Sequence, residues 1–111
     1  MLTWYRTRLE QEFPARYVIF GHIGDAHVHV NLFSDPTDPA PANALLLEFA
    51  RHAVSLGGTV SAEHGLGKRK SHLLPLQFTP EEIESMKAVK RRLDPQWLLG
   101  RGNVFGAPPT R

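Results

Sequence analysis

Residues 17–33 read YVIFGHIGDAHVHVNLF, and this stretch decides the fold that we expect for the whole chain. Residues 17–20 are β-branched or aromatic and apolar on both faces, which predicts a central strand over residues 16–22. Gly24-Asp25 predicts a turn. Residues 27–33 then alternate between two faces, with Val28, Val30 and Leu32 on one and His27, His29, Asn31 and Phe33 on the other. The stretch therefore predicts two neighbouring strands, of which the second carries a polar face.

Two helices are expected to flank these strands. Residues 2–12 read as a helix closed by Pro14, with an apolar stripe of Leu2, Tyr5, Leu9 and Phe13. Residues 41–56 read as a second helix that Gly57-Gly58 stops, with a stripe of Leu46, Phe49, Ala50, Ala53 and Leu56. Both stripes are interpreted as core packing.

A further helix is expected near the C-terminus. Thr79 is its cap, Pro80 its first residue and Glu82 the partner in a capping box, and Asp94-Pro95 ends it. Its buried face is predicted to be Ile83, Met86, Val89 and Leu93. Residues 59–62 are a candidate short strand, and residues 97–105 are expected to form a loop.

The order of these elements predicts an α+β domain, with helices packed on a small, mainly antiparallel sheet. We expect residues 1–111 to form a single domain. Three strands are few, so another part of a longer chain is expected to complete the sheet. The first helix also starts at Met1 without a capping residue before it, which is a weak indication of a longer protein.

Composition sets broad limits. Thirteen basic and eleven acidic residues give a formal charge of +2, too small to argue for nucleic acid. The chain has no cysteine, which excludes disulfides and thiolate metal sites. No apolar run approaches the roughly 20 residues of a membrane span. We therefore expect a cytoplasmic protein without a membrane span.

Two polar clusters carry the expected chemistry. His22 and His29 flank the Gly-Asp turn and can converge if the strands fold back together, and Glu63 would add a carboxylate. Such a set suits a divalent zinc, manganese, iron or cobalt ion that binds a hydroxy acid as a Lewis acid. His64 is the candidate general base, and Asn31 a candidate donor to a substrate carboxylate. His27 is ambiguous, Lys70 is either a solvated residue or an anion contact, and His52 and His72 carry no functional prediction.

Three motifs resemble the C-terminal domain of FAD-linked oxidases, the group that contains D-lactate dehydrogenases, glycolate oxidases and D-2-hydroxyglutarate dehydrogenases. Residues 21–31 resemble Gly-His-x-Gly-Asp-Gly-Asn-x-His-x-Asn, residues 57–70 resemble Gly-Gly-x-x-x-x-Glu-His-Gly-x-Gly-x-x-Lys, and residues 93–103 resemble the family's closing motif.

The resemblance implies part of a ferredoxin-like α/β plait whose sheet faces a flavin. It implies metal ligation by His22, His29 and Glu63, substrate contact by Asn31 and base catalysis by His64. Hydride would pass from C2 of a D-2-hydroxy acid to FAD.

The chain departs from the family pattern at two places. Ala26 and His27 replace Gly-Asn, and an alanine there could forbid a positive φ. Gly100-Arg101-Gly102-Asn103 replaces Asn-Pro-Gly-Lys, which puts the flavin contacts of this tail in doubt; Asn103 is the cofactor-side candidate. The sequence shows no FAD-binding domain, so a separate domain or subunit would hold most of the FAD, and we expect the isolated chain to be inactive.

Two other functions compete with this interpretation. His27-Val28-His29-Val30-Asn31 imitates the strand of histidine-triad nucleotide hydrolases, although Asn31 stands at the third histidine. Alternatively, the chain is a truncated, inactive domain that serves only as an interaction module. Because the chain is expected to hold only part of its sheet, a homodimer through an exposed strand edge is a further expectation.

Overall fold

The computed structural model of the chain describes residues 1–106. It divides into two compact units, unit 1 (Met1–Ala53) and unit 2 (Val54–Arg111). That residues 1–111 form one domain stays a prediction. None of the helices described is both long enough and apolar enough to span a membrane.

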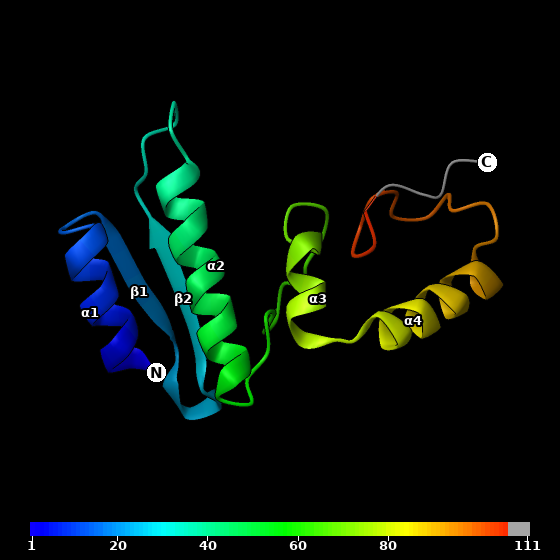
Figure 1. Ribbon diagram of the computed structural model, residues 1–111, viewed down its shortest axis with the longest axis horizontal. Helices are drawn as coiled ribbons and strands as arrows, with labels where there is room; N and C mark the ends of the chain where they lie inside the picture. The colour runs from blue at the N-terminus through cyan, green and yellow to red at the C-terminus, as the bar shows by residue number, and fades with distance from the viewer. Residues whose placement is uncertain (107–111) are drawn as a thin grey trace. The chain divides into compact units, whose positions relative to one another are not determined.

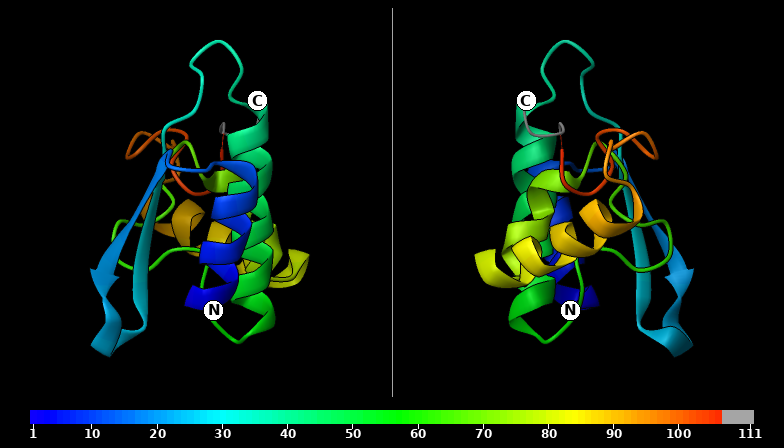
Figure 2. Two further views of the ribbon diagram at one scale, coloured as in Figure 1. Left: turned by 90° about the vertical axis from the view of Figure 1, so that its left-hand side faces the viewer. Right: turned by 90° about the vertical axis from the view of Figure 1, so that its right-hand side faces the viewer.

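Unit 1 is a β-hairpin with two helices on one of its faces (Figures 1 and 2). Its elements, in chain order, are α1 (Leu2–Glu12), β1 (Tyr17–His22), the 3-10 turn η1 (Ile23–Asp25), β2 (His27–Leu32) and α2 (Ala40–Ser55). The strands pair antiparallel, with Phe20 opposite His29 and His22 opposite His27. The predicted α+β class, with a small antiparallel sheet and helices on one face, is confirmed.

The core of unit 1 lies between the helices and the hairpin. Tyr5, Leu9 and Phe13 of the first predicted stripe are buried, and Leu9 is 0% exposed. The Tyr5 ring stacks on Phe49 at 4.3 Å between centroids, and its hydroxyl donates to the Phe49 carbonyl oxygen at 3.0 Å. This hydrogen bond satisfies the one polar group of a side chain that is otherwise packed among apolar neighbours.

The stripe predicted for the second helix is partly wrong. Phe49 is buried, but Leu46 and Leu56 are exposed, and Ala42 and Leu45 take their place in the core. Ala42, Leu45 and Phe49 are spaced by three and four residues, so they lie on one face of α2. The predicted stripe began at Leu46, the residue after Leu45, and so lay partly on a neighbouring face of the helix.

The hairpin has two different faces. Tyr17, Ile19, Val30 and Leu32 pack against the helical core. Because strand side chains alternate, the opposite face carries Val18, Phe20, His22, His27, His29 and Asn31, and we call it the outer face. The prediction of a central strand at residues 16–22 is wrong for the described residues, since β1 pairs with β2 alone and Phe20 is 51% exposed.

Unit 2 contains η2 (Ser71–Leu73), the short helix α3 (Leu74–Gln77) and α4 (Pro80–Leu93). The capping box at the start of α4 is confirmed: the Glu82 amide donates to Thr79 Oγ1, and the Thr79 amide to Glu82 Oε2. The predicted strand at residues 59–62 does not form. Instead, the Val60 amide donates to Gln77 Oε1 at 3.0 Å, so a side chain replaces a neighbouring strand as its partner.

The buried face predicted for α4 is also partly wrong. Ile83 and Met86 are half-buried, but Val89 is exposed and Leu93 is 78% exposed. The chain beyond the helix is held by Asp94, whose carboxylate accepts the Leu98 and Leu99 amides, each at 2.9 Å, and the Lys90 ammonium. The tail thus forms the expected loop, and these hydrogen bonds hold its first turn. The hydrogen bond from Lys90 holds the pKa of Asp94 below its ordinary value.

We expect Gly21→Ala to destabilise the hairpin. A Cβ at Gly21 would lie 2.2 Å from the His27 carbonyl oxygen, and the residue has a φ of +152°. The free energy of unfolding should fall by about 2 kcal/mol or more, measured by urea denaturation. Gly24→Ala is the control, because a Cβ there meets no heavy atom within 4 Å; equal losses in both variants would contradict the assignment.

We expect Asp94→Asn to reduce stability above pH 5 and to flatten the acid limb of the stability profile. A carboxylate whose folded pKa is lowered contributes stability above its unfolded pKa of about 3.9. That contribution disappears as the pH falls through the folded pKa. Urea unfolding between pH 7 and pH 2 measures the difference between the variants. Asp38→Asn, a carboxylate in unit 1, controls for net charge, and parallel wild-type and Asp94→Asn profiles would refute the role.

Candidate functional site

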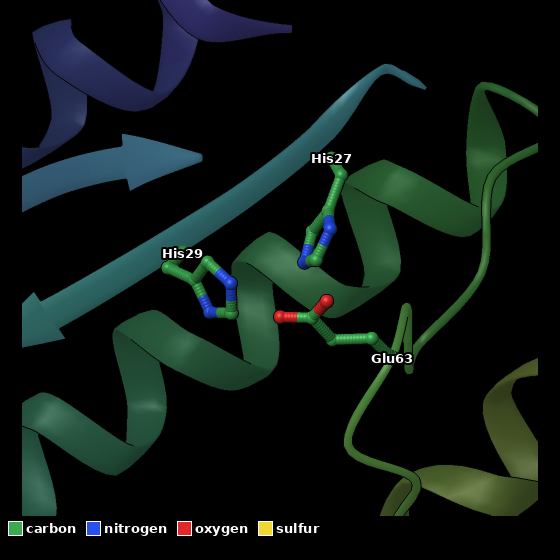
Figure 3. Close-up of side chains that lie close together, drawn as sticks. All are labelled: His27, His29 and Glu63. Carbon is green, nitrogen blue, oxygen red and sulfur yellow. The ribbon is translucent and has the colours of Figure 1, made fainter. Parts of the chain in front are cut away.

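Three histidines line one end of the outer face. His22 and His27 are register partners across the strands, with ring centroids 5.8 Å apart, and His27 and His29 follow each other along β2 at 4.5 Å. Figure 3 shows the His27 and His29 imidazoles projecting from the same side of β2. One ring nitrogen of His27 lies within 4.8 Å of one of His29. The ring nitrogens of His27 and His29 are therefore close enough to bind one ligand together.

Phe20 is a site neighbour that the sequence reasoning missed. Its ring stacks on His29, with centroids 4.8 Å apart and planes inclined by 15°. The stacking holds the plane of the imidazole in one orientation. Counting residues outward from the Gly24-Asp25 turn would have placed Phe20 opposite His29.

Asn31 continues the same face. It lies two residues beyond His29 and opposite Val18, and it is exposed. The structure thus brings together three predicted site residues, His22, His29 and Asn31, on one side of the hairpin. The carboxamide can donate to an anionic group that lies over this face.

Ala26 lies in the turn between the strands, and its backbone conformation tests the expectation that alanine could forbid a positive φ there. This residue adopts a φ of +51° and closes η1, with its amide donating to the Ile23 carbonyl oxygen at 3.2 Å. The expectation that alanine could forbid a positive φ is therefore wrong. The left-handed conformation is kept in spite of the Cβ, at a steric cost that a glycine would avoid.

Glu63 and His64 belong to unit 2. They lie on an irregular segment after α2, and Glu63 Oε1 is 3.2 Å from His64 Nε2. The two side chains therefore contact each other instead of facing apart as they would on a strand. A carboxylate at this distance pairs with the imidazolium that forms when His64 accepts a proton.

Lys70 and Asn103 are also in unit 2, and both are exposed. Lys70 precedes η2, and its amide donates to the Leu66 carbonyl oxygen at 3.1 Å. Asn103 lies in the C-terminal turn, which the hydrogen bond from the Val104 amide to the Gly67 carbonyl oxygen ties to the Glu63 segment. The motifs at residues 57–70 and 93–103 are thus neighbours within unit 2.

The predicted site residues divide between the units. His22, His29 and Asn31 lie in unit 1, and Glu63, His64, Lys70 and Asn103 lie in unit 2. Their roles as ligands, base and substrate or cofactor contacts stay predictions. The structure establishes two local groups, the histidines of the outer face and the Glu63–His64 pair.

Comparisons with known proteins agree with the three motifs. Residues 3–104 match the family described as FAD linked oxidases, C-terminal domain. The GlcD subunit of glycolate oxidase from Bacillus subtilis is 35% identical over 101 residues, which is 85% of this chain and 22% of that protein. D-2-hydroxyglutarate dehydrogenase of Stutzerimonas stutzeri is 38% identical over 98 residues (81% and 20%). The probable mitochondrial D-lactate dehydrogenase of Danio rerio is 37% identical over 95 residues (83% and 19%).

The chain spans about a fifth of the length of these relatives. No solved structure matches it significantly. The matches support the resemblance to FAD-linked oxidases, and they give no support to the histidine-triad alternative.

We expect Ala26→Gly to stabilise unit 1. Ala26 is in the left-handed region, where a Cβ costs about 1 kcal/mol relative to glycine. The free energy of unfolding, measured in urea, should rise by up to about 1 kcal/mol. The gain is reduced because glycine has more conformational freedom than alanine in the unfolded chain. Ala53→Gly, within α2, is the control and should lose about 1 kcal/mol. A loss of stability in Ala26→Gly would contradict the strained turn.

Proposed function

This chain belongs to the C-terminal domain family of FAD linked oxidases, and from this premise we propose that it supplies the substrate side of an oxidoreductase that converts a D-2-hydroxy acid to a 2-oxo acid. The observation that carries the proposal is the outer face of the hairpin, where His22, His29 and Asn31 share one side. The names of the relatives support a small hydroxy acid as the substrate class, since they are named for glycolate, D-lactate and D-2-hydroxyglutarate.

The donor chemistry of the outer face fits a divalent metal ion. His22 and His29 would be its imidazole ligands, and the resemblance assigns the carboxylate ligand to Glu63 of unit 2. This is a set that zinc, manganese, iron or cobalt accepts, with positions left for substrate oxygens. When bound, the ion would supply Lewis-acid chemistry at the substrate hydroxyl.

His64 would act as the general base. Its imidazole would accept the hydroxyl proton, and the Glu63 carboxylate, 3.2 Å from Nε2, would pair with the resulting imidazolium. If Nε2 faces the carboxylate, Nδ1 is the nitrogen that accepts the proton. Asn31 and the Lys70 ammonium would hold the substrate carboxylate and so orient its C2–H bond.

FAD would supply the hydride acceptor, and another domain or subunit would hold most of it. Among residues 1–106, the helices α2 and α4 begin at Ala40 and Pro80, and no glycine-rich loop directly precedes either of them. These two helix starts therefore offer no cradle for a pyrophosphate of the kind that dinucleotide folds build. A FAD-binding domain or subunit is the partner that the proposal requires, and Asn103 is the residue of this chain proposed to approach the cofactor.

The proposal predicts that this chain can replace the matching segment of a relative. A chimera of Bacillus subtilis GlcD that carries this chain should retain bound FAD. Under anaerobic conditions, glycolate, D-lactate or D-2-hydroxyglutarate should bleach the flavin absorbance. His64→Asn should slow this bleaching by about 10²- to 10⁴-fold, the usual contribution of a general base.

His72→Asn is the matched control, because His72 is an exposed histidine outside the motifs. It should change the rate by less than twofold. A chimera that holds FAD but is bleached by none of the three acids would overturn the proposed function. Equal bleaching rates in the chimera with and without His64→Asn would show that His64 is not the general base, and the chain's place in the family would be unchanged.

A further inference from the structure

His27 is the direct neighbour of both histidines of the family pattern. It faces His22 directly across the strands and follows His29 on β2, whereas His22 and His29 are diagonal neighbours. Diagonal residues of an antiparallel pair have Cα atoms about 7–8 Å apart, farther than direct partners. An ion shared by His22 and His29 would lie over the square that these two residues form with His27 and Phe20, so the His27 imidazole would stand beside the ion.

The ring positions favour binding. With a metal–nitrogen distance of about 2.0–2.1 Å, two imidazoles on a tetrahedral ion have centroids about 5 Å apart. The separations of 5.8 Å for His22–His27 and 4.5 Å for His27–His29 bracket this value. Small rotations about the side-chain torsions would bring the three rings onto one ion, because the partly exposed outer face leaves them room.

We propose that His27 is a third imidazole ligand of the divalent cation, beside His22 and His29. The inference rests on the proposed function, because it places the ion at the same site. Its chemical consequence is selectivity: imidazole suits zinc, cobalt and nickel, whereas manganese prefers oxygen donors. Phe20, stacked on His29, supports the site by fixing one of the three rings.

The test is metal binding by the 111-residue chain, read without any enzymatic activity. Cobalt(II) is titrated into wild type, and its visible absorption spectrum reports coordination geometry and nitrogen ligands; zinc is then measured by competition. His27→Asn, which restores the family residue, should lower the cobalt and zinc affinities by about 10- to 100-fold and shift the cobalt spectrum. Manganese affinity should change less than threefold. His72→Asn is the control and should change none of these values.

The outcomes separate this inference from the proposed function. If His29→Asn abolishes cobalt binding while His27→Asn leaves affinity and spectrum unchanged, His27 is not a ligand and the inference fails while the proposed metal site stands. If wild type binds neither cobalt nor zinc, the inference is overturned, and the flavin-bleaching experiment still decides the proposed function on its own. His27→Thr, a residue that suits a strand, repeats the measurement should the asparagine variant fold poorly.

Discussion

The close approach of Gly21 to the carbonyl oxygen of His27 is the constraint on which unit 1 depends. No side chain fits between the two backbones at this point, so the strands can meet there only at a glycine. This contact fixes the register that pairs Phe20 with His29 and His22 with His27. A slip by one residue would turn the histidines toward the helices and the apolar residues toward solvent, because side chains of a strand alternate. One glycine thus decides both which face is buried and which face carries the histidines.

The two faces of the hairpin differ: the inner face packs on the helical core, and the outer face carries the polar residues. Its inner face packs on α1 and α2 around Leu9, Tyr5 and Phe49, and these contacts hold the strands without help from the polar residues. The outer face is therefore free to carry imidazoles and a carboxamide, which contribute little to the core. Groups mounted on paired strands are also held more precisely than groups on loops. The positions of His27 and His29 depend on the same register as the core, so their geometry is as well defined as the hairpin.

Sequence reasoning recovered the parts of the structure that local chemistry determines. The strand at Tyr17–His22, the alternation of His27, His29 and Asn31, and the capping box at Thr79 all depend on near neighbours in the chain. The errors occur where contacts between residues far apart in the sequence determine the local structure. Residues 59–62 lack a strand because Gln77 supplies the partner for the Val60 amide, and α2 turns Leu45 rather than Leu46 into the core because α1 lies on that side. Of the candidate site, the sequence predicted the shared face of His27, His29 and Asn31, but the places of Phe20 opposite His29 and of His27 opposite His22 follow from the strand register.

The remaining misplaced residues share one property, which is that their pattern indicates burial and the structure exposes them. Val18 and Phe20 make β1 apolar on both faces, and Val89 and Leu93 extend the stripe of α4, yet all four are exposed. An apolar periodicity indicates a surface that is buried when the protein functions, because an aromatic face exposed to water contributes nothing to folding. For the outer face, the proposed function would give this pattern a physical reason, because a hairpin that held a metal ion and a substrate opposite a flavin would be covered by the domain that binds the cofactor. A covered site excludes water from the reacting atoms, and Phe20 and Val18 would then supply the apolar surface that such an interface buries.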